Sequence, residues 1–270
     1  MKRVLWAVIL VGCLLAIRWP VDAIVGAAPT TAPAVRARST GEQIPSEDPL
    51  VRNLHSMGLI DGHTNVFRSA CPVSDITRMM TTTQPSDDVL AAARARMQHL
   101  YDLGIRTDIS FQTAGANTAP TTAPTRRFSE ARDIDLERRA AEMVGITFIN
   151  DAMSNSGPDS LQSMSDDEVH AWLDAESAKI LDCAKTGGVL FHCQAGHDRA
   201  GIVGAYIRIK FEHWPVDQAI DEMRRLGHDW VGFSANGGIS SWHEDHLRAI
   251  AKTIEGLAGN TLNVAGNSQN

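Results

Sequence analysis

The chain has 270 residues, 43% of them hydrophobic, and a formal net charge of −7. This apolar content can fill a core, and the acidic balance without a basic cluster argues against nucleic acid as a partner. Any attraction for phosphate must therefore come from local groups.

Residues 1–27 have the pattern of a signal peptide or membrane anchor. Two basic residues follow Met1, and the apolar run from Val4 to Ile17 has signal-peptide length and is short for a membrane span. Small-residue cleavage sites follow this run, whereas the Leu-Val-Gly-Cys sequence that ends at Cys13 resembles a bacterial lipobox. We expect an exported protein, periplasmic, secreted or membrane-anchored, whose only membrane contact is this segment. A cleaved signal, a lipid anchor and an uncleaved helix all stay open.

Composition divides the rest of the chain into three parts. Residues 28–50 are rich in Pro, Thr, Ala and charge without apolar periodicity, which is typical of a flexible linker outside the fold. Residues 51–258 suit one folded domain. Residues 259–270 form a polar tail that we expect to be disordered.

Within residues 51–258, apolar periodicity and helix start and stop signals predict alternating strands and helices. The expected strands lie within residues 105–111, 146–149 and 188–191. The expected helices cover residues 86–103, 128–144, 165–185, 202–211 and 240–258. Residues 112–127, with Thr-Ala-Pro twice, are expected to form a surface excursion.

The most informative stretch joins the strand at residues 188–191 to the helix that follows. Its sequence is His192-Cys193-Gln194-Ala195-Gly196-His197-Asp198-Arg199-Ala200-Gly201. A loop that enters a helix points unpaired backbone N–H groups into one concavity, and the helix dipole adds positive charge there, so the loop can hold a phosphate dianion. Two glycines allow the backbone to approach closely. The expected phosphate-binding residues are Gln194, Ala195, Gly196, His197, Asp198 and Arg199.

Cys193 and Arg199 would supply the reactive chemistry of this loop. A thiol at a helix N-terminus is stabilised as the nucleophilic thiolate, and the planar guanidinium of Arg199 can grip two phosphoryl oxygens. We expect the Cys193 sulfur to attack phosphorus in line, giving a phosphocysteine intermediate that water hydrolyses. Because loop amides and Arg199 stabilise the charge, no metal or cofactor is expected.

The H-C-x5-R-x-G pattern after a strand resembles the signature loop of the cysteine-dependent protein tyrosine and dual-specificity phosphatase superfamily. Its A-G-x-D-R form is similar to the bacterial and lipid-active branches, and N-x-x-R-S-x-x-P from Asn65 to Pro72 resembles a strand of the atypical dual-specificity phosphatases. The helix from Trp214 to Met223 also resembles a packing helix of the family. The resemblance implies an α/β domain of three layers, with a four- to five-stranded, mainly parallel central sheet flanked by helices.

The resemblance also implies supporting residues beside the loop. His192 would orient the loop by hydrogen bonding rather than act as a base. Arg68 and Ser69 would face the phosphate pocket, or they would merely end a polar strand before a proline turn.

The general acid is the weak point of the match. The family commonly has an Asp about three residues before a Pro in a mobile loop, but the corresponding position here is Asn155, which cannot donate a proton in this sense. Three aspartates are alternatives, and we rank Asp198 first, Asp159 second and Asp151 third. Asp198 has the simpler interpretation of a helix N-terminal charge that orders the loop.

A second departure is Ala200, where most relatives have a Ser or Thr whose hydroxyl donates to the cysteine sulfur. Without this donor the phosphocysteine is expected to accumulate, visible as a burst of released alcohol.

The expected function is a phosphatase of protein-tyrosine or dual-specificity type, with phosphorylated proteins, lipids or small molecules as substrates. A phosphate-binding pseudophosphatase with little turnover and, less favoured, a rhodanese-type sulfurtransferase are the alternatives.

The remaining cysteines and histidines give weaker signals. Cys71 or Cys183 would form a reversible disulfide with Cys193, or both would be buried unpaired thiols. His243 and His246 stand three apart in a helix without a third ligand, so we expect surface residues rather than a metal site. A protonated His197 at the phosphate mouth would favour acidic substrates.

Overall fold

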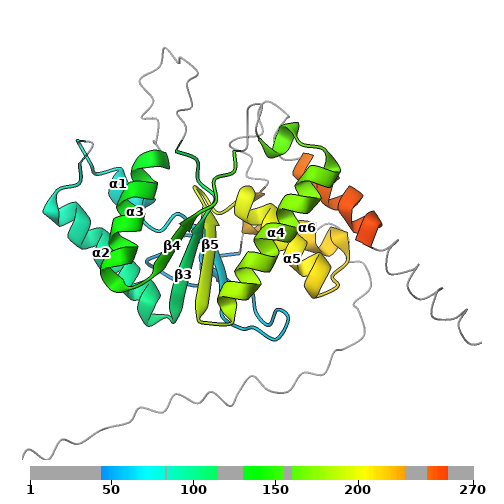
Figure 1. Ribbon diagram of the computed structural model, residues 1–270, viewed down its shortest axis with the longest axis horizontal. Coiled ribbons are helices and arrows are strands. Elements are labelled where there is room, and N and C mark those ends of the chain that lie inside the picture. Colours follow the sequence, from blue (N-terminus) through cyan, green and yellow to red (C-terminus); the bar gives the residue numbers. More distant parts are fainter. Residues whose placement is uncertain (1–43, 83, 115–129, 155–159, 229–241, 255–270) are drawn as a thin grey trace, which may run out of the picture. The chain divides into compact units, whose positions relative to one another are not determined.

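The fold is built on a five-stranded sheet with the strand order β1-β2-β5-β3-β4 (Figure 1). The computed structural model describes residues 44–82, 84–114, 130–154, 160–228 and 242–254. The expected signal or anchor, most of the linker and the tail lie outside the described residues, as do Asn155 and Asp159. Most of the expected surface excursion lies outside them too.

Four of the five strands are parallel, as expected. They are β2 (Val66–Ala70), β5 (Gly188–Cys193), β3 (Ile105–Ser110) and β4 (Thr147–Asn150). The short strand β1 (His55–Ser56) is antiparallel to β2 at the edge. The carboxyl ends of the parallel strands therefore meet at one edge, which is where open α/β sheets carry their sites.

Helices cover both faces of the sheet, which confirms the three-layer expectation. One face packs against α1 (Ser74–Thr77), α2 (Asp87–Asp102) and α3 (Glu130–Val144). The other packs against α4 (Asp166–Ala184), α5 (Arg199–Phe211), α6 (Val216–Met223) and a further helix at residues 242–254. Side chains of β5 alternate between the two cores, with Leu190 in the first and Val189, Phe191 and Cys193 in the second.

Local sequence signals account for the helix ends. The Ser86 hydroxyl accepts a hydrogen bond from the Val89 N–H at the start of α2. Ser165 and Glu168 form a reciprocal capping box at the start of α4. A 3-10 turn, η2 (Leu161–Ser163), precedes α4, and a π-helical turn, η3 (Arg224–His228), follows α6.

Two expectations need correction. The last residues of the expected linker contact the domain, because the Ile44 N–H donates to the Arg225 carbonyl at 2.9 Å, so the ordered contacts begin by Ile44 and not at residue 51. His243 is fully buried, and its ring stacks on Trp242 with centroids 3.6 Å apart, because the helix packs this face against the domain. In the part of the chain that the structure describes, no helix is long and apolar enough to cross a membrane.

Candidate active site

Cys193 is the last residue of β5, and its side chain is 2% exposed. Its Cα is paired with that of Ala70, the last residue of β2, so two strand ends meet at the start of the loop. Arg199, six positions later, is the first residue of α5 and is 6% exposed. The strand, loop and helix order predicted from the sequence is confirmed.

Neighbouring donors hold the loop by its carbonyl groups. The Asn53 side-chain amide donates to the carbonyls of Ala195 at 3.4 Å and Gly196 at 3.2 Å. Arg68 Nη2 donates to the same Gly196 carbonyl at 2.6 Å. The loop carbonyls point toward Asn53 and Arg68. The backbone N–H groups are therefore expected on the opposite side of the loop, which is the arrangement that an anion-binding loop requires.

Gly196 is required at its position for two reasons. Its φ is +74°, a region that residues with a side chain rarely adopt. A Cβ added there would lie 2.5 Å from the Ser69 carbonyl oxygen in β2. The loop therefore sits directly against the neighbouring strand.

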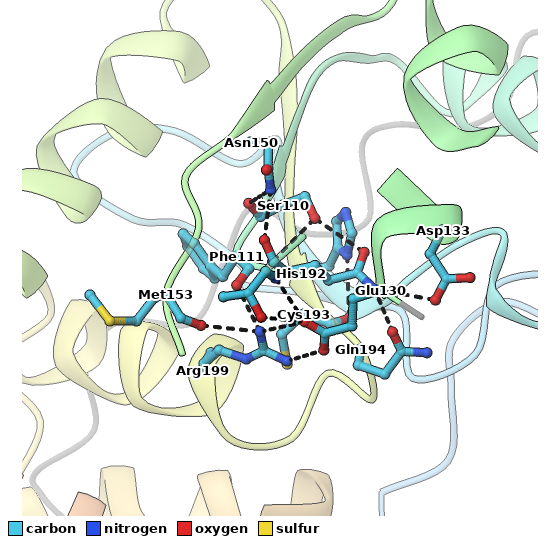
Figure 2. A network of polar contacts seen from close by, with 12 residues as sticks. Ser110, Phe111, Glu130, Asp133, Asn150, Met153, His192, Cys193, Gln194 and Arg199 are labelled. Atoms are coloured by element: carbon cyan, nitrogen blue, oxygen red, sulfur yellow. Dashed lines mark hydrogen bonds and ion pairs between the residues drawn. The ribbon is translucent and has the colours of Figure 1, made fainter. Parts of the chain in front are cut away.

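Arg199 is held by a set of acceptors that we call the arginine clamp, formed by Glu130 and the carbonyls of Phe111 and Met153 (Figure 2). Its Nη2 donates to Glu130 Oε1 at 2.6 Å, and its Nη1 lies 3.3 Å from Oε2, 2.8 Å from the Phe111 oxygen and 3.1 Å from the Met153 oxygen. Glu130 itself accepts from the backbone N–H of Thr113 at 2.7 Å. The end of β3, the start of α3 and the segment after β4 thus fix the guanidinium.

The electrostatics of the two nearby arginines differ. Burial alone would lower the pKa of Arg199, but the charges of Cys193 and Glu130 outweigh it and raise this pKa. Burial lowers the pKa of Arg68 to about 10, although Cys193 is again among the groups that raise it. Arg68 is 1% exposed, lies near Gly204 and donates to the Gly196 carbonyl, so it supports the loop.

His192 lies on the opposite side of β5 from Cys193. It is fully buried, and its Nδ1 donates to the Cys193 carbonyl at 3.3 Å. The carboxylates of Asp108 and Glu137 each lie 3.3 Å from its Nε2. Burial alone would lower the pKa of His192, but these two carboxylates raise it to about 10.

The polar residues at the end of the loop are also positioned by contacts. His228 Nδ1 lies 3.0 Å from Asp198 Oδ1. Burial alone would raise the pKa of Asp198, but the hydrogen bond from His228 and nearby positive charge lower it. Burial lowers the pKa of His197 to about 4, so His197 is neutral at neutral pH and adds no positive charge there.

The other residues that the sequence analysis named each make contacts of their own. Asp151 is paired with Lys179 of α4. The Gln194 side chain accepts a hydrogen bond from Gln112 at the end of β3. Ser69 donates to the Ala70 carbonyl at 2.6 Å, which leaves its hydroxyl within the strand.

The three described cysteines are free. Cys71 is turned toward α3, where its sulfur lies 3.9 Å from Glu137 Oε2, whereas Cys193 belongs to the other core. Cys183 is near the end of α4, close to Thr107, and Thr107 is paired with Val189 four positions before Cys193. The structure therefore does not bring either thiol toward Cys193.

Glu130 and Asn53 are site residues that sequence reasoning missed. Glu130 is an acidic residue in the first turn of α3, where it has the ordinary explanation of a favourable helix-dipole charge. Asn53 has φ +56°, and nothing in its local sequence marks it as a support for a loop about 140 positions later. Only the tertiary contacts reveal either role.

Comparison with known proteins agrees with this geometry. Residues 85–209 match the sequence model of the tyrosine phosphatase family, which confirms the resemblance seen in the signature loop. No curated protein matches the chain.

Three solved structures are distantly similar. TpbA of P. aeruginosa is 19% identical, with 77% of this chain and 95% of that chain covered and a TM-score of 0.43. The kinase associated phosphatase, with its catalytic-site cysteine replaced by serine, is 16% identical, with 78% and 98% covered and a TM-score of 0.46. The Siw14 catalytic core is 14% identical, with 82% and 96% covered and a TM-score of 0.38.

Proposed function

We propose that this chain, whose residues 85–209 match the tyrosine phosphatase family, is a phosphomonoester hydrolase that forms a phosphocysteine intermediate. The observation that carries the proposal is the arginine clamp. It fixes a buried guanidinium whose pKa is raised by the charge of Cys193, six positions away in a loop held by its carbonyls. The proposal places a tetrahedral dianion between the loop amides and Arg199, which are the kinds of donor that such an anion requires.

Two chemical steps follow. The Cys193 sulfur attacks phosphorus, the bond from phosphorus to the leaving oxygen breaks, and a general acid protonates that oxygen. Water then attacks the phosphocysteine, which releases inorganic phosphate and regenerates the thiolate. Arg199 and the loop amides stabilise the charge on the equatorial oxygens in both steps.

The proton donor is the open part of this mechanism. Asp198 is on the loop, but its lowered pKa and its contact with His228 keep it ionised near neutral pH, which is unfavourable for an acid. The carboxylate of Asp151 forms an ion pair with Lys179, so it is not free to act as the acid. We therefore propose Asp159 as the acid, with Asp198 positioning the loop through His228.

Phosphotyrosine-type esters are the favoured substrates. The nucleophile is 2% exposed, and we propose that its substrate carries the phosphate on a group long enough to reach it. An aromatic ester satisfies this requirement better than a short alkyl phosphate. Phosphorylated lipids and small molecules are alternatives that the same assays compare.

The main test compares the full chain with Cys193→Ser and with the matched control Cys183→Ser, using p-nitrophenyl phosphate and thiosulfate. We expect phosphatase activity that falls roughly 10⁴-fold or more in Cys193→Ser and is unchanged in Cys183→Ser. Phosphate binding without turnover would instead support a pseudophosphatase. Thiocyanate formation from thiosulfate and cyanide would support a sulfurtransferase.

A second test locates the acid. Asp159→Asn should slow hydrolysis of phenyl phosphate much more than hydrolysis of p-nitrophenyl phosphate, because only the poorer leaving group needs the proton. Asp198→Asn should slow both esters equally if Asp198 only positions the loop. The reverse pattern would assign the acid to Asp198.

A further inference from the structure

Four metal-ligating side chains meet on the α3 side of the sheet, directly behind the phosphate loop. They come from four segments, and we call them the donor cluster: Cys71 after β2, Asp108 in β3, Glu137 in α3 and His192 in β5. Three of them are fully buried, and Cys71 is 3% exposed. The phosphatase chemistry proposed above uses none of the four directly.

Three of the four side chains bring a ligand atom close to the others. Single ligand atoms of Cys71, Glu137 and His192 all lie within 4.8 Å of one another. His192 Nε2 is 3.3 Å from Glu137 Oε1 and 3.3 Å from Asp108 Oδ1, and the Cys71 sulfur is 3.9 Å from Glu137 Oε2. Bonds of about 2.0–2.3 Å to a tetrahedral zinc ion place adjacent ligand atoms about 3.3–3.7 Å apart. The approach of His192 to Glu137 lies in that range, whereas single ligand atoms of all three residues are only within 4.8 Å of one another and would have to move closer around an ion.

Several of these atoms lack hydrogen bonds, although the Cys71 sulfur donates to Glu137 Oε2. His192 Nε2, Glu137 Oε1 and both carboxylate oxygens of Asp108 are buried and have no hydrogen-bond partner among the described residues, although the nitrogen and oxygens lie close together. Buried polar atoms are normally satisfied, and buried carboxylates require a counter-charge. Unsatisfied donors directed at a shared point are what a metal site presents.

The histidine is already oriented as a ligand. A carbonyl oxygen only accepts, so the hydrogen bond to Cys193 places a proton on His192 Nδ1. Nε2 faces the two carboxylates, and a positive charge there, either a proton on Nε2 or a bound metal ion, neutralises this arrangement. Metal-bound histidines commonly donate their other N–H to a backbone carbonyl in this way.

We propose that Cys71, Glu137 and His192 bind a zinc ion behind the phosphate loop, with Asp108 beside His192 and outside this three-ligand group. Mixed sulfur, nitrogen and carboxylate ligands suit Zn²⁺ rather than Mg²⁺ or Ca²⁺, which prefer oxygen alone. The ion would join the ends of β2 and β5 to α3 and fix the ring that holds the Cys193 carbonyl. This role would be structural, and it differs from the sequence-based expectation of no metal, which stays untested.

Occupancy is tested on the full chain without an affinity tag. Because the donors are buried, the protein is unfolded in chelator, freed of metal and refolded with or without zinc, and its metal content is then measured by mass spectrometry. We expect about one tightly held zinc per chain and a higher unfolding temperature after refolding with zinc. Wild-type protein that folds with zinc present yet retains no stoichiometric metal would overturn the proposal.

Ligand identity is tested with variants and with cobalt. Cys71→Ser and Glu137→Gln should lose the bound metal, whereas the matched control Cys183→Ser should keep it. Refolding with Co²⁺ should give a thiolate-to-cobalt charge-transfer band in wild type and in Cys193→Ser but not in Cys71→Ser. A band that disappears only with Cys193 would also refute the site. Because metal content is read independently of turnover, either proposal can fail without the other.

Discussion

The arginine clamp in front of Cys193 and the donor cluster behind it bury charge in opposite ways. In the clamp, both terminal nitrogens of Arg199 meet oxygen acceptors at 2.6 to 3.3 Å. In the donor cluster, His192 Nε2 is as close to two carboxylates but makes no hydrogen bond with them. In the clamp the two terminal nitrogens are paired and only Arg199 Nε has no hydrogen-bond partner among the described residues, whereas the cluster is complete only with extra protons or a cation.

The pKa values reflect the same contrast. Burial by itself lowers the pKa of Arg199, yet its partners raise it, so the cation is stabilised where it lies. Burial raises the pKa of Glu137 well above its usual range, and the charge of Asp108 raises it further, although His192 opposes both. Charge is therefore matched by side chains in the arginine clamp, whereas in the donor cluster it is matched by the protons on His192 and Glu137.

Replacing the cation of the clamp should have the largest effect. Arg199→Lys keeps one positive charge but cannot meet Glu130 and a phosphoryl group with a planar fork, so we expect kcat/KM to fall by about 10³-fold. Glu130→Gln is the matched comparison, with a loss of only about 10-fold, because the amide oxygen still accepts one hydrogen bond. Equal activity of Arg199→Lys and wild type in steady-state assays would remove Arg199 from the mechanism.

Gly196→Ala should destabilise the loop itself. The new methyl group would meet the Ser69 carbonyl at 2.5 Å in a backbone with φ +74°, and we expect a loss of about 2–3 kcal/mol in the free energy of unfolding. Gly145→Ala is the control, because its φ is +82° but the nearest atom lies at 3.9 Å. Urea denaturation that ranks the two variants equally would show that the contact with β2 is unimportant.

Ala200→Ser should accelerate the second chemical step. Ala200 is fully buried beside Arg199, and a hydroxyl at this position could donate to the departing sulfur. We expect a pre-steady-state burst in wild type and a steady-state rate about 10-fold higher in the variant, with the burst reduced. Rapid mixing that finds no burst in wild type would mean that phosphocysteine hydrolysis does not limit turnover.

The smallest effect concerns the pH dependence of stability. The folded-state pKa of Asp198 is lowered, so its contribution is fully present above the unfolded-state pKa and is lost as pH falls through the folded value. The free energy of unfolding of wild type should exceed that of Asp198→Asn by less than about 1 kcal/mol near neutral pH, because the side chain is partly solvated. This difference should vanish at acidic pH. Unfolding experiments in which this advantage grows on acidification would contradict the assignment.

Local sequence patterns were sufficient for most elements of the fold. Ser86 and the Ser165–Glu168 pair mark helix starts that the structure confirms, and the apolar run after Thr186 becomes β5. Each of these signals depends on residues only a few positions apart, so it can be recognised in a single sequence. The brief edge strand β1 and the helix α1 have no comparable pattern and were not predicted.

The environment of the loop was predictable only in part. Cys193 and Arg199 share one loop, so their spacing is visible in the sequence, whereas the interaction of Glu130 with Arg199 spans 69 positions. The donor cluster depends on β5 lying between β2 and β3, an order that no local pattern specifies. His243 illustrates the same limit, since its burial depends on which face of the helix meets η3.

Asn53 links two parts of the molecule through a single amide. Besides its two contacts with the phosphate loop, it donates to the Leu226 carbonyl in η3 at 3.2 Å. The two N–H groups of this amide are shared among three carbonyls and link η3 to the phosphate loop. A displacement of η3 would therefore be expected to move the loop. Affinity for the phosphoryl group can therefore be tuned by substitutions near residue 226 that never touch a ligand.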